Sequence, residues 1–203
     1  MAARDSYLTG FIKGLINVFT GGAGVVDDQL KDAARRDERE RRDAGSLSAT
    51  RRAEATDAAT ARAQSGHTAT IEIDPPARSA LRISYAPERD GDPDAGEIVW
   101  TWVPYAEHDG RGKDRPVLVI ARQSDERVYA VRLTSKAHDG DRDFVSIGTG
   151  PWDGQGRPSW IDIEQLYSVH AEGMRREASA LDRARFTRVA HALHGRYGWD
   201  IDG

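Results

Sequence analysis

Residues 97–104 read EIVWTWVP, residues 116–121 read PVLVIA and residues 127–134 read RVYAVRLT. These segments are rich in β-branched and aromatic residues, and stretches with Gly, Asp and Pro separate them, which is typical of short strands. Two further segments of the same kind follow at 144–147 and 160–166. The spacing predicts a fold that is mainly β with some α, built on a small antiparallel β-barrel or strongly curved sheet.

The end of the chain carries the pattern of one helix. Asp182 is a suitable N-cap, and Gly195 and Gly198 follow the last turn. Apolar residues recur between them at positions i, i+3, i+4 and i+7, namely Phe186, Val189, Ala190 and Leu193. We therefore expect a C-terminal helix that covers one face of the sheet.

The first half of the chain has a different composition. Between residues 20 and 70 the only large aliphatic residues are Val25, Val26, Leu30 and Leu47, and these are too few to form a core. Ala, Arg, Asp and Glu dominate 27–64, which predicts solvated helix or disorder. Strand-like pieces at 71–73 and 81–85 precede a Pro- and Gly-rich linker. We predict three parts: 1–26, the charged region and linker at 27–95, and a folded domain at 96–203.

Residues 5–19 have apolar residues at helical spacing and end before two glycines. Such a helix either docks on a membrane surface or partner, or covers an apolar patch of its own protein. The most apolar stretch, 11–19, is interrupted by Lys13 and Asn17 and is too short to span a bilayer. The sequence predicts no signal peptide, no stable membrane insertion and a cytoplasmic protein, in agreement with its lack of cysteine.

Charge and motifs exclude several classes of function. The formal net charge is −4, so overall basicity does not indicate a nucleic-acid binder, although a local basic site stays open. The absence of cysteine excludes thiolate catalysis and cysteine zinc sites, and the histidines have no zinc-binding spacing. The Gly-rich segment 148–156 lacks the Lys-Ser/Thr of a phosphate loop, and no nucleophile elbow occurs. We expect no metal and no cofactor.

Two polar segments border the predicted strands. Residues 107–116 read EHDGRGKDRP, and Pro116 restricts the backbone after Arg115, so that this guanidinium can face a phosphate. The alternative is a surface Arg that pairs with Asp109 or Asp114. The second segment, 133–139, reads LTSKAHD, and its hydroxyl, Lys and His side chains could hold a phosphate or could serve only the turn.

Four blocks then suggest a family. Residues 96–100 (GEIVW), 112–120 (GKDRPVLVI), 133–136 (LTSK) and 163–166 (IEQL) resemble, in order and spacing, the MazF/PemK toxins of type II toxin-antitoxin systems. The resemblance covers about 100 residues, from residue 96 to about 199. The second block is fairly specific, and the others gain weight from their order.

The resemblance implies an SH3-like, MazF-like barrel that dimerises and cuts single-stranded RNA without a metal. The 2′-hydroxyl attacks the adjacent phosphorus, which leaves a 2′,3′-cyclic phosphate and a 5′-hydroxyl. The family's catalytic Arg and Thr fall on Arg115 and Thr134. A separately encoded antitoxin would block the RNA groove. We expect four further residues to flank the groove, as contacts to the RNA backbone or as proton carriers: Lys113, Ser135, Lys136 and His138.

The chain departs from the family pattern in two places. Tyr167 stands where these toxins often carry Arg, and we expect it to stack a base. The first 95 residues have no counterpart in compact toxins. Two alternatives therefore stay open: a non-catalytic interaction module on the same barrel, such as a topoisomerase-binding or DNA-binding regulatory protein, and a chain whose N-terminal arm carries the function.

Overall fold

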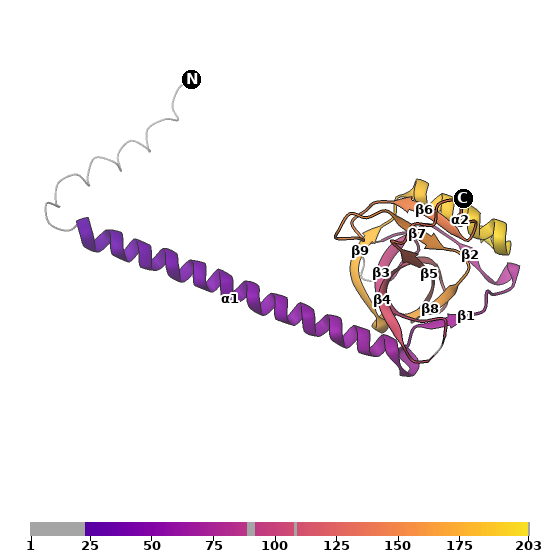
Figure 1. The fold of residues 1–203 in the computed structure, drawn as a ribbon. Helices are drawn as coiled ribbons and strands as arrows, with labels where there is room; N and C mark the ends of the chain where they lie inside the picture. Colours follow the sequence, from indigo (N-terminus) through magenta and orange to yellow (C-terminus); the bar gives the residue numbers. More distant parts are fainter. Residues whose placement is uncertain (1–22, 89–91, 108, 203) are drawn as a thin grey trace, which may run out of the picture. The chain divides into compact units, whose positions relative to one another are not determined.

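The predicted antiparallel sheet is present in the computed structural model of the chain, which describes residues 23–88, 92–107 and 109–202. Its centre is the meander β3 (Glu97–Pro104), β4 (Gly112–Arg122) and β5 (Arg127–Thr134). The strand order is β1-β8-β5-β4-β3-β9, and β7 joins β5 to β6. The remaining strands of this sheet are β1 (Ile71–Ile73), β6 (Phe144–Gly148), β7 (Ser159–Asp162), β8 (Leu166–His170) and β9 (Met174–Ala180). The ribbon curls into a half-barrel (Figure 1), which confirms the predicted fold class.

The sheet buries apolar side chains on both faces because successive residues of a strand point to opposite sides. In β4, Leu118 and Ile120 belong to the larger cluster, which also contains the apolar residues of the C-terminal helix. Val117 and Val119 belong to a second cluster with residues of β3, β5 and β8. All four side chains are fully buried, so β4 is the central structural strand.

The C-terminal helix α2 (Arg183–Tyr197) confirms the predicted caps and buried face. The Asp182 carboxylate accepts a hydrogen bond from the Arg185 backbone N–H at 2.9 Å. Gly198 has a φ of 72° and donates its N–H to the carbonyl of His194, which closes the last turn. The four buried residues are the predicted ones, Phe186, Val189, Ala190 and Leu193.

The two strand-like pieces expected at 71–73 and 81–85 contain strands of the fold, β1 (Ile71–Ile73) and β2 (Arg82–Ile83). β1 pairs with β8, and β2 (Arg82–Ile83) forms a two-stranded parallel sheet with β10 (Asp200–Ile201). Ile83 is fully buried in the larger cluster. The Trp199 indole N–H donates to the Pro76 carbonyl at 3.0 Å. Gly96, with a φ of 105°, lies against Tyr85 so closely that a Cβ would be 2.8 Å from the ring.

Helix α1 (Ala23–Gln64) precedes the sheet, and the chain divides into two compact units, residues 1–52 and 53–203. Every described side chain from residue 34 to 55 is exposed, as the lack of apolar residues predicts. Ala59 and Ala63, near the end of α1, are buried in the second unit.

The predicted helix at 5–19 lies outside the described residues. Among the described helices none is long and apolar enough to cross a membrane. Short 3-10 turns occur at Gly66–Thr68, Arg78–Ala80 and Ala171–Gly173.

Candidate functional site

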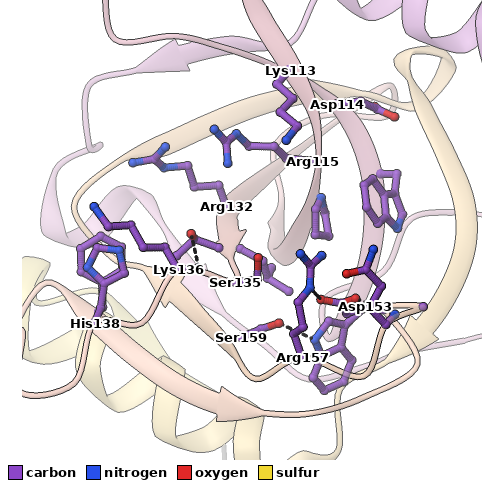
Figure 2. A pocket seen from close by; sticks show the side chains of 18 residues that line it. Lys113, Asp114, Arg115, Arg132, Ser135, Lys136, His138, Asp153, Arg157 and Ser159 are labelled. Atoms are coloured by element: carbon purple, nitrogen blue, oxygen red, sulfur yellow. Dashed lines mark hydrogen bonds and ion pairs between the residues drawn. The ribbon is translucent and has the colours of Figure 1, made fainter.

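A groove of about 760 Å³ opens between the first half of β4, the end of β5 and the turn that precedes β7. Figure 2 shows the side chains that line it. Six of the seven residues predicted from the sequence lie in this groove, namely Lys113, Arg115, Thr134, Ser135, Lys136 and His138. The fold thus brings together two segments that are about twenty residues apart in the sequence.

Arg115 lies on β4, opposite Thr101 of β3, and its side chain lines the groove. The two carboxylates that could have paired with it have other partners. Asp109 binds the Arg111 guanidinium at 2.6 Å, and Asp114 binds Arg175. Within the described part of the chain, the Arg115 guanidinium forms no hydrogen bond or ion pair. Its donors therefore face the groove, ready for an anionic ligand.

Thr134 ends β5, where it lies opposite Trp160 of β7. Its Oγ1 accepts a hydrogen bond from the Lys136 backbone N–H at 3.2 Å. This turn fixes the hydroxyl oxygen at the mouth of the groove and leaves the hydroxyl proton available as a donor. The sequence left open whether this side chain serves only the turn. The hydroxyl of Thr134 does take part in the turn, and this contact positions the hydroxyl for a ligand in the groove.

His138 lies at one end of the groove. Its ring stacks on Phe144, with ring centroids 3.5 Å apart and an angle of 12° between the planes. Its Nδ1 lies 3.4 Å from a carboxylate oxygen of Asp141. The imidazole is therefore held in one orientation by an aromatic contact and a carboxylate.

Arg132 and Arg157 also line the groove, and neither was predicted as a site residue from the sequence. Arg132 precedes Thr134 by two residues on the same strand, so strand alternation could have indicated it. Arg157 lies directly after the Gly-rich segment 148–156, before β7, and binds Asp153 at 2.8 Å. That hydrogen bond lowers the pKa of the Asp153 carboxyl. No pattern in the turn itself would have marked Arg157 as a groove residue.

The groove is cationic although the whole chain is acidic. Its lining carries five Lys and Arg side chains and only two carboxylates, Asp114 and Asp153. Both carboxylates bind an arginine, so neither presents an unbalanced negative charge. Trp152 also lines the groove, and its indole N–H donates to Ser159 Oγ at 3.1 Å. Such a groove suits a polyanion with flat, stackable groups.

Among the described residues no group of three or more His, Asp or Glu side chains could hold a metal ion.

Tyr167 is the one predicted site residue that does not line the groove. Its side chain is only 1% exposed and packs in the second apolar cluster. The hydroxyl donates to Gln165 Oε1 at 2.9 Å, and burial raises the pKa of the phenol above its usual value. Tyr167 lies opposite both Ala130 and Glu72, so its strand has neighbours on both sides. In this structure the ring has no free face for a base.

The Tyr167→Leu variant should therefore lose stability but not ligand affinity. Removal of the buried ring should lower the free energy of unfolding by about 1–3 kcal/mol. If the ring instead stacked on a base, affinity for a single-stranded RNA should fall by about 1–3 kcal/mol. Denaturant unfolding and fluorescence anisotropy on the same variant distinguish the two roles, and weaker binding at unchanged stability would contradict the buried role.

The half-barrel and the groove define a small β protein with a cationic cleft built from β4, β5 and the turn before β7. The model of one family, described as PemK-like, MazF-like toxin of type II toxin-antitoxin system, matches residues 94–195, about half of the chain. The chain belongs to this family of toxins.

Several solved structures are similar in fold. An "Endoribonuclease in complex with its cognate antitoxin from Mycobacterial species" is 18% identical, with a TM-score of 0.40, and the match covers 53% of this chain and 96% of that one. MazF (Form-I) from Deinococcus radiodurans is 26% identical, with a TM-score of 0.39 and coverages of 52% and 96%. Mycobacterium tuberculosis toxin MazF-mt6 is 16% identical, with a TM-score of 0.37 and coverages of 50% and 98%. No curated protein matches the chain.

Proposed function

We propose that this toxin is an endoribonuclease that cuts single-stranded RNA without a metal ion. One observation carries the proposal: the unpaired guanidinium of Arg115 and the oriented hydroxyl of Thr134 line the same cationic groove. Membership of the toxin family supports it. In this proposal the two residues act together on one phosphate of the RNA backbone.

The proposed reaction is an internal transesterification. The 2′-oxygen of one nucleotide forms a bond to the adjacent phosphorus, and the bond from phosphorus to the 5′-oxygen of the next nucleotide breaks. The 2′-hydroxyl loses a proton and the leaving 5′-oxygen gains one, so the step needs no water, oxidant or second substrate. Negative charge grows on the phosphoryl oxygens, where Arg115 and Thr134 donate hydrogen bonds.

The flanking residues have a supporting role in this reaction. Lys113 and Lys136 bind backbone phosphates, because each is a mobile cation at the groove. Ser135 adds a hydroxyl donor next to Thr134. His138 is the groove residue suited to move a proton, because one imidazole nitrogen can accept a proton while the other donates one.

Two protein partners complete the proposal. The first is an antitoxin from a separate gene, whose acidic residues occupy the groove in place of RNA. The second is another copy of the chain, in a homodimer. Single-stranded RNA is the substrate, and the groove described above is its proposed binding site.

Cleavage assays on the full chain test this function. Purified protein is incubated in EDTA with a long RNA of little structure and, in parallel, with DNA of the same sequence. We expect fragments from the RNA and none from the DNA, because DNA has no 2′-hydroxyl. Intact RNA that stays bound to folded protein would favour the alternative, a non-catalytic binding module on the same barrel.

A further inference from the structure

Arg132, which lines the groove, forms an ion pair with Asp162, which does not. Strands β5 and β7 are antiparallel, with Leu133 opposite Ile161, and this register places Arg132 across from Asp162. The Asp162 Oδ2 atom lies 2.8 Å from Nε and 2.6 Å from Nη2 of Arg132. The carboxylate side chain is 2% exposed, whereas the guanidinium side chain is 28% exposed. The acid is thus buried beneath the sheet surface, and the base reaches the groove.

The pair leaves hydrogen-bond donors of Arg132 available. Asp162 occupies one edge of the guanidinium through a single oxygen, and its second oxygen accepts the Glu164 backbone N–H at 2.9 Å. A guanidinium carries five N–H groups, so donors on Nη1 and Nη2 are still free to bind a ligand. Because the carboxylate lies below and the cation lies at the surface, the pair presents its positive end to the groove.

The position of Arg132 relative to Thr134 is suited to an RNA backbone. The two residues alternate along β5, and two residues of a strand span about 6–7 Å. This distance is comparable with the separation of adjacent phosphates in a nucleic-acid strand. If Thr134 and Arg115 act on one phosphate, Arg132 lies at the spacing of the next. In the view of Figure 2, the cationic ends of Arg115 and Arg132 follow one another along the same side of the groove.

We propose that Arg132, held by Asp162, binds the RNA phosphate adjacent to the one that is cleaved. This inference rests on the proposed ribonuclease function and adds a binding residue to it. Arg132 is better suited than Arg157, whose side chain is 53% exposed in a turn and whose carboxylate partner belongs to the same turn. A guanidinium fixed by a buried acid loses less conformational freedom when it binds a phosphate.

The test uses a pair of substitutions that removes both charges. Arg132→Gln alone would leave the buried Asp162 carboxylate without its partner and could unfold the protein. The double variant R132Q/D162N keeps the net charge of the chain and leaves no unpaired buried charge. Its matched control is R82Q/D202N, which removes an exposed ion pair of 3.1 Å outside the residues that line the groove.

The ligand for the test is a single-stranded 2′-O-methyl RNA, which cannot undergo the proposed reaction. Affinity is measured by fluorescence anisotropy over a range of salt concentrations. For R132Q/D162N we expect about tenfold weaker binding. The plot of log affinity against log salt should also be less steep by about 0.7, because one phosphate contact is lost. With cleavable RNA, KM should rise about tenfold and kcat should change little. The control should match the wild type in every respect.

Wild-type affinity and salt slope in a folded R132Q/D162N variant would overturn the inference and reduce the ion pair to a structural role. If this variant does not fold, Arg132→Lys replaces it, since lysine keeps the charge beside Asp162 but lacks the planar fork. Severalfold weaker binding by Arg132→Lys at an unchanged salt slope supports the inference, and wild-type affinity overturns it. Failure of the wild type to bind or cut RNA would instead refute the proposed function, and the inference with it.

Discussion

Arg115→Ala should abolish most of the RNA cleavage while the protein stays folded. The guanidinium forms no hydrogen bond or ion pair among the described residues and lines the groove, so its loss removes hydrogen-bond donors aimed at the reacting phosphate. Loss of one such donor from a preorganised site lowers the rate by about 10²–10³-fold. Stability should change by less than about 0.5 kcal/mol, since the partly exposed Arg115 loses no hydrogen bond or ion pair. Single-turnover cleavage rates and thermal unfolding measure the two effects.

Arg111→Ala is the matched control for this variant. Arg111 lies in the loop directly before β4, four residues from Arg115, but its guanidinium binds Asp109 and it does not line the groove. Its removal takes away the same charge at a distance from the phosphate, so the cleavage rate should stay within about twofold of the wild type. A similar loss of rate in both variants would mean that this end of β4 supplies only general positive charge, and it would contradict the role given to Arg115.

A chain that begins at residue 53 should fold, whereas a chain that begins at residue 96 should not. The shorter one lacks β1, β2 and the carbonyl that binds the Trp199 indole. Leu81 and Ile83 are 3% and 0% exposed, and burial of each such side chain contributes about 1.5–3 kcal/mol. That loss is comparable with the whole free energy of unfolding of a small domain, about 5–15 kcal/mol. Circular dichroism with denaturant unfolding compares the two chains.

The chain that begins at residue 53 is also the control for the N-terminal arm. The unit 53–203 keeps the groove and the two apolar clusters, so we expect cleavage within about threefold of the full chain. A folded and active chain from residue 96 would place the domain boundary where the sequence suggested it. A folded but inactive chain from residue 53 would give the function to the arm instead.

Local patterns in the sequence predicted the elements that depend on neighbours along the chain. Helix α2 was predicted with its cap at Asp182 and its four buried residues, because capping and a 3.6-residue period are local properties. Arg115 and Thr134 were predicted as one site only through the resemblance to a known family. The structure places both in one groove, but their catalytic roles stay a prediction.

Features that depend on the register between strands could not be read from the sequence. A shift of one residue moves a side chain to the opposite face of a sheet, so the burial of Tyr167 was not evident. The Arg132–Asp162 pair joins residues thirty positions apart, which meet only because β5 and β7 are neighbours. The strand-like pieces at 71–73 and 81–85 could be recognised from the sequence, but their partners could not, because β1 pairs with β8 and β2 with β10, both far along the chain.

The chemical ends of the RNA fragments test the central claim most directly. Wild-type protein is incubated with RNA in EDTA beside Arg115→Ala, and the new termini are identified by mass spectrometry. We predict 2′,3′-cyclic phosphates and 5′-hydroxyls from the wild type, and almost no new ends from Arg115→Ala. Fragments with 5′-phosphates and 3′-hydroxyls would require attack by water in place of the 2′-hydroxyl. That result would contradict the mechanism proposed for the groove of Arg115 and Thr134.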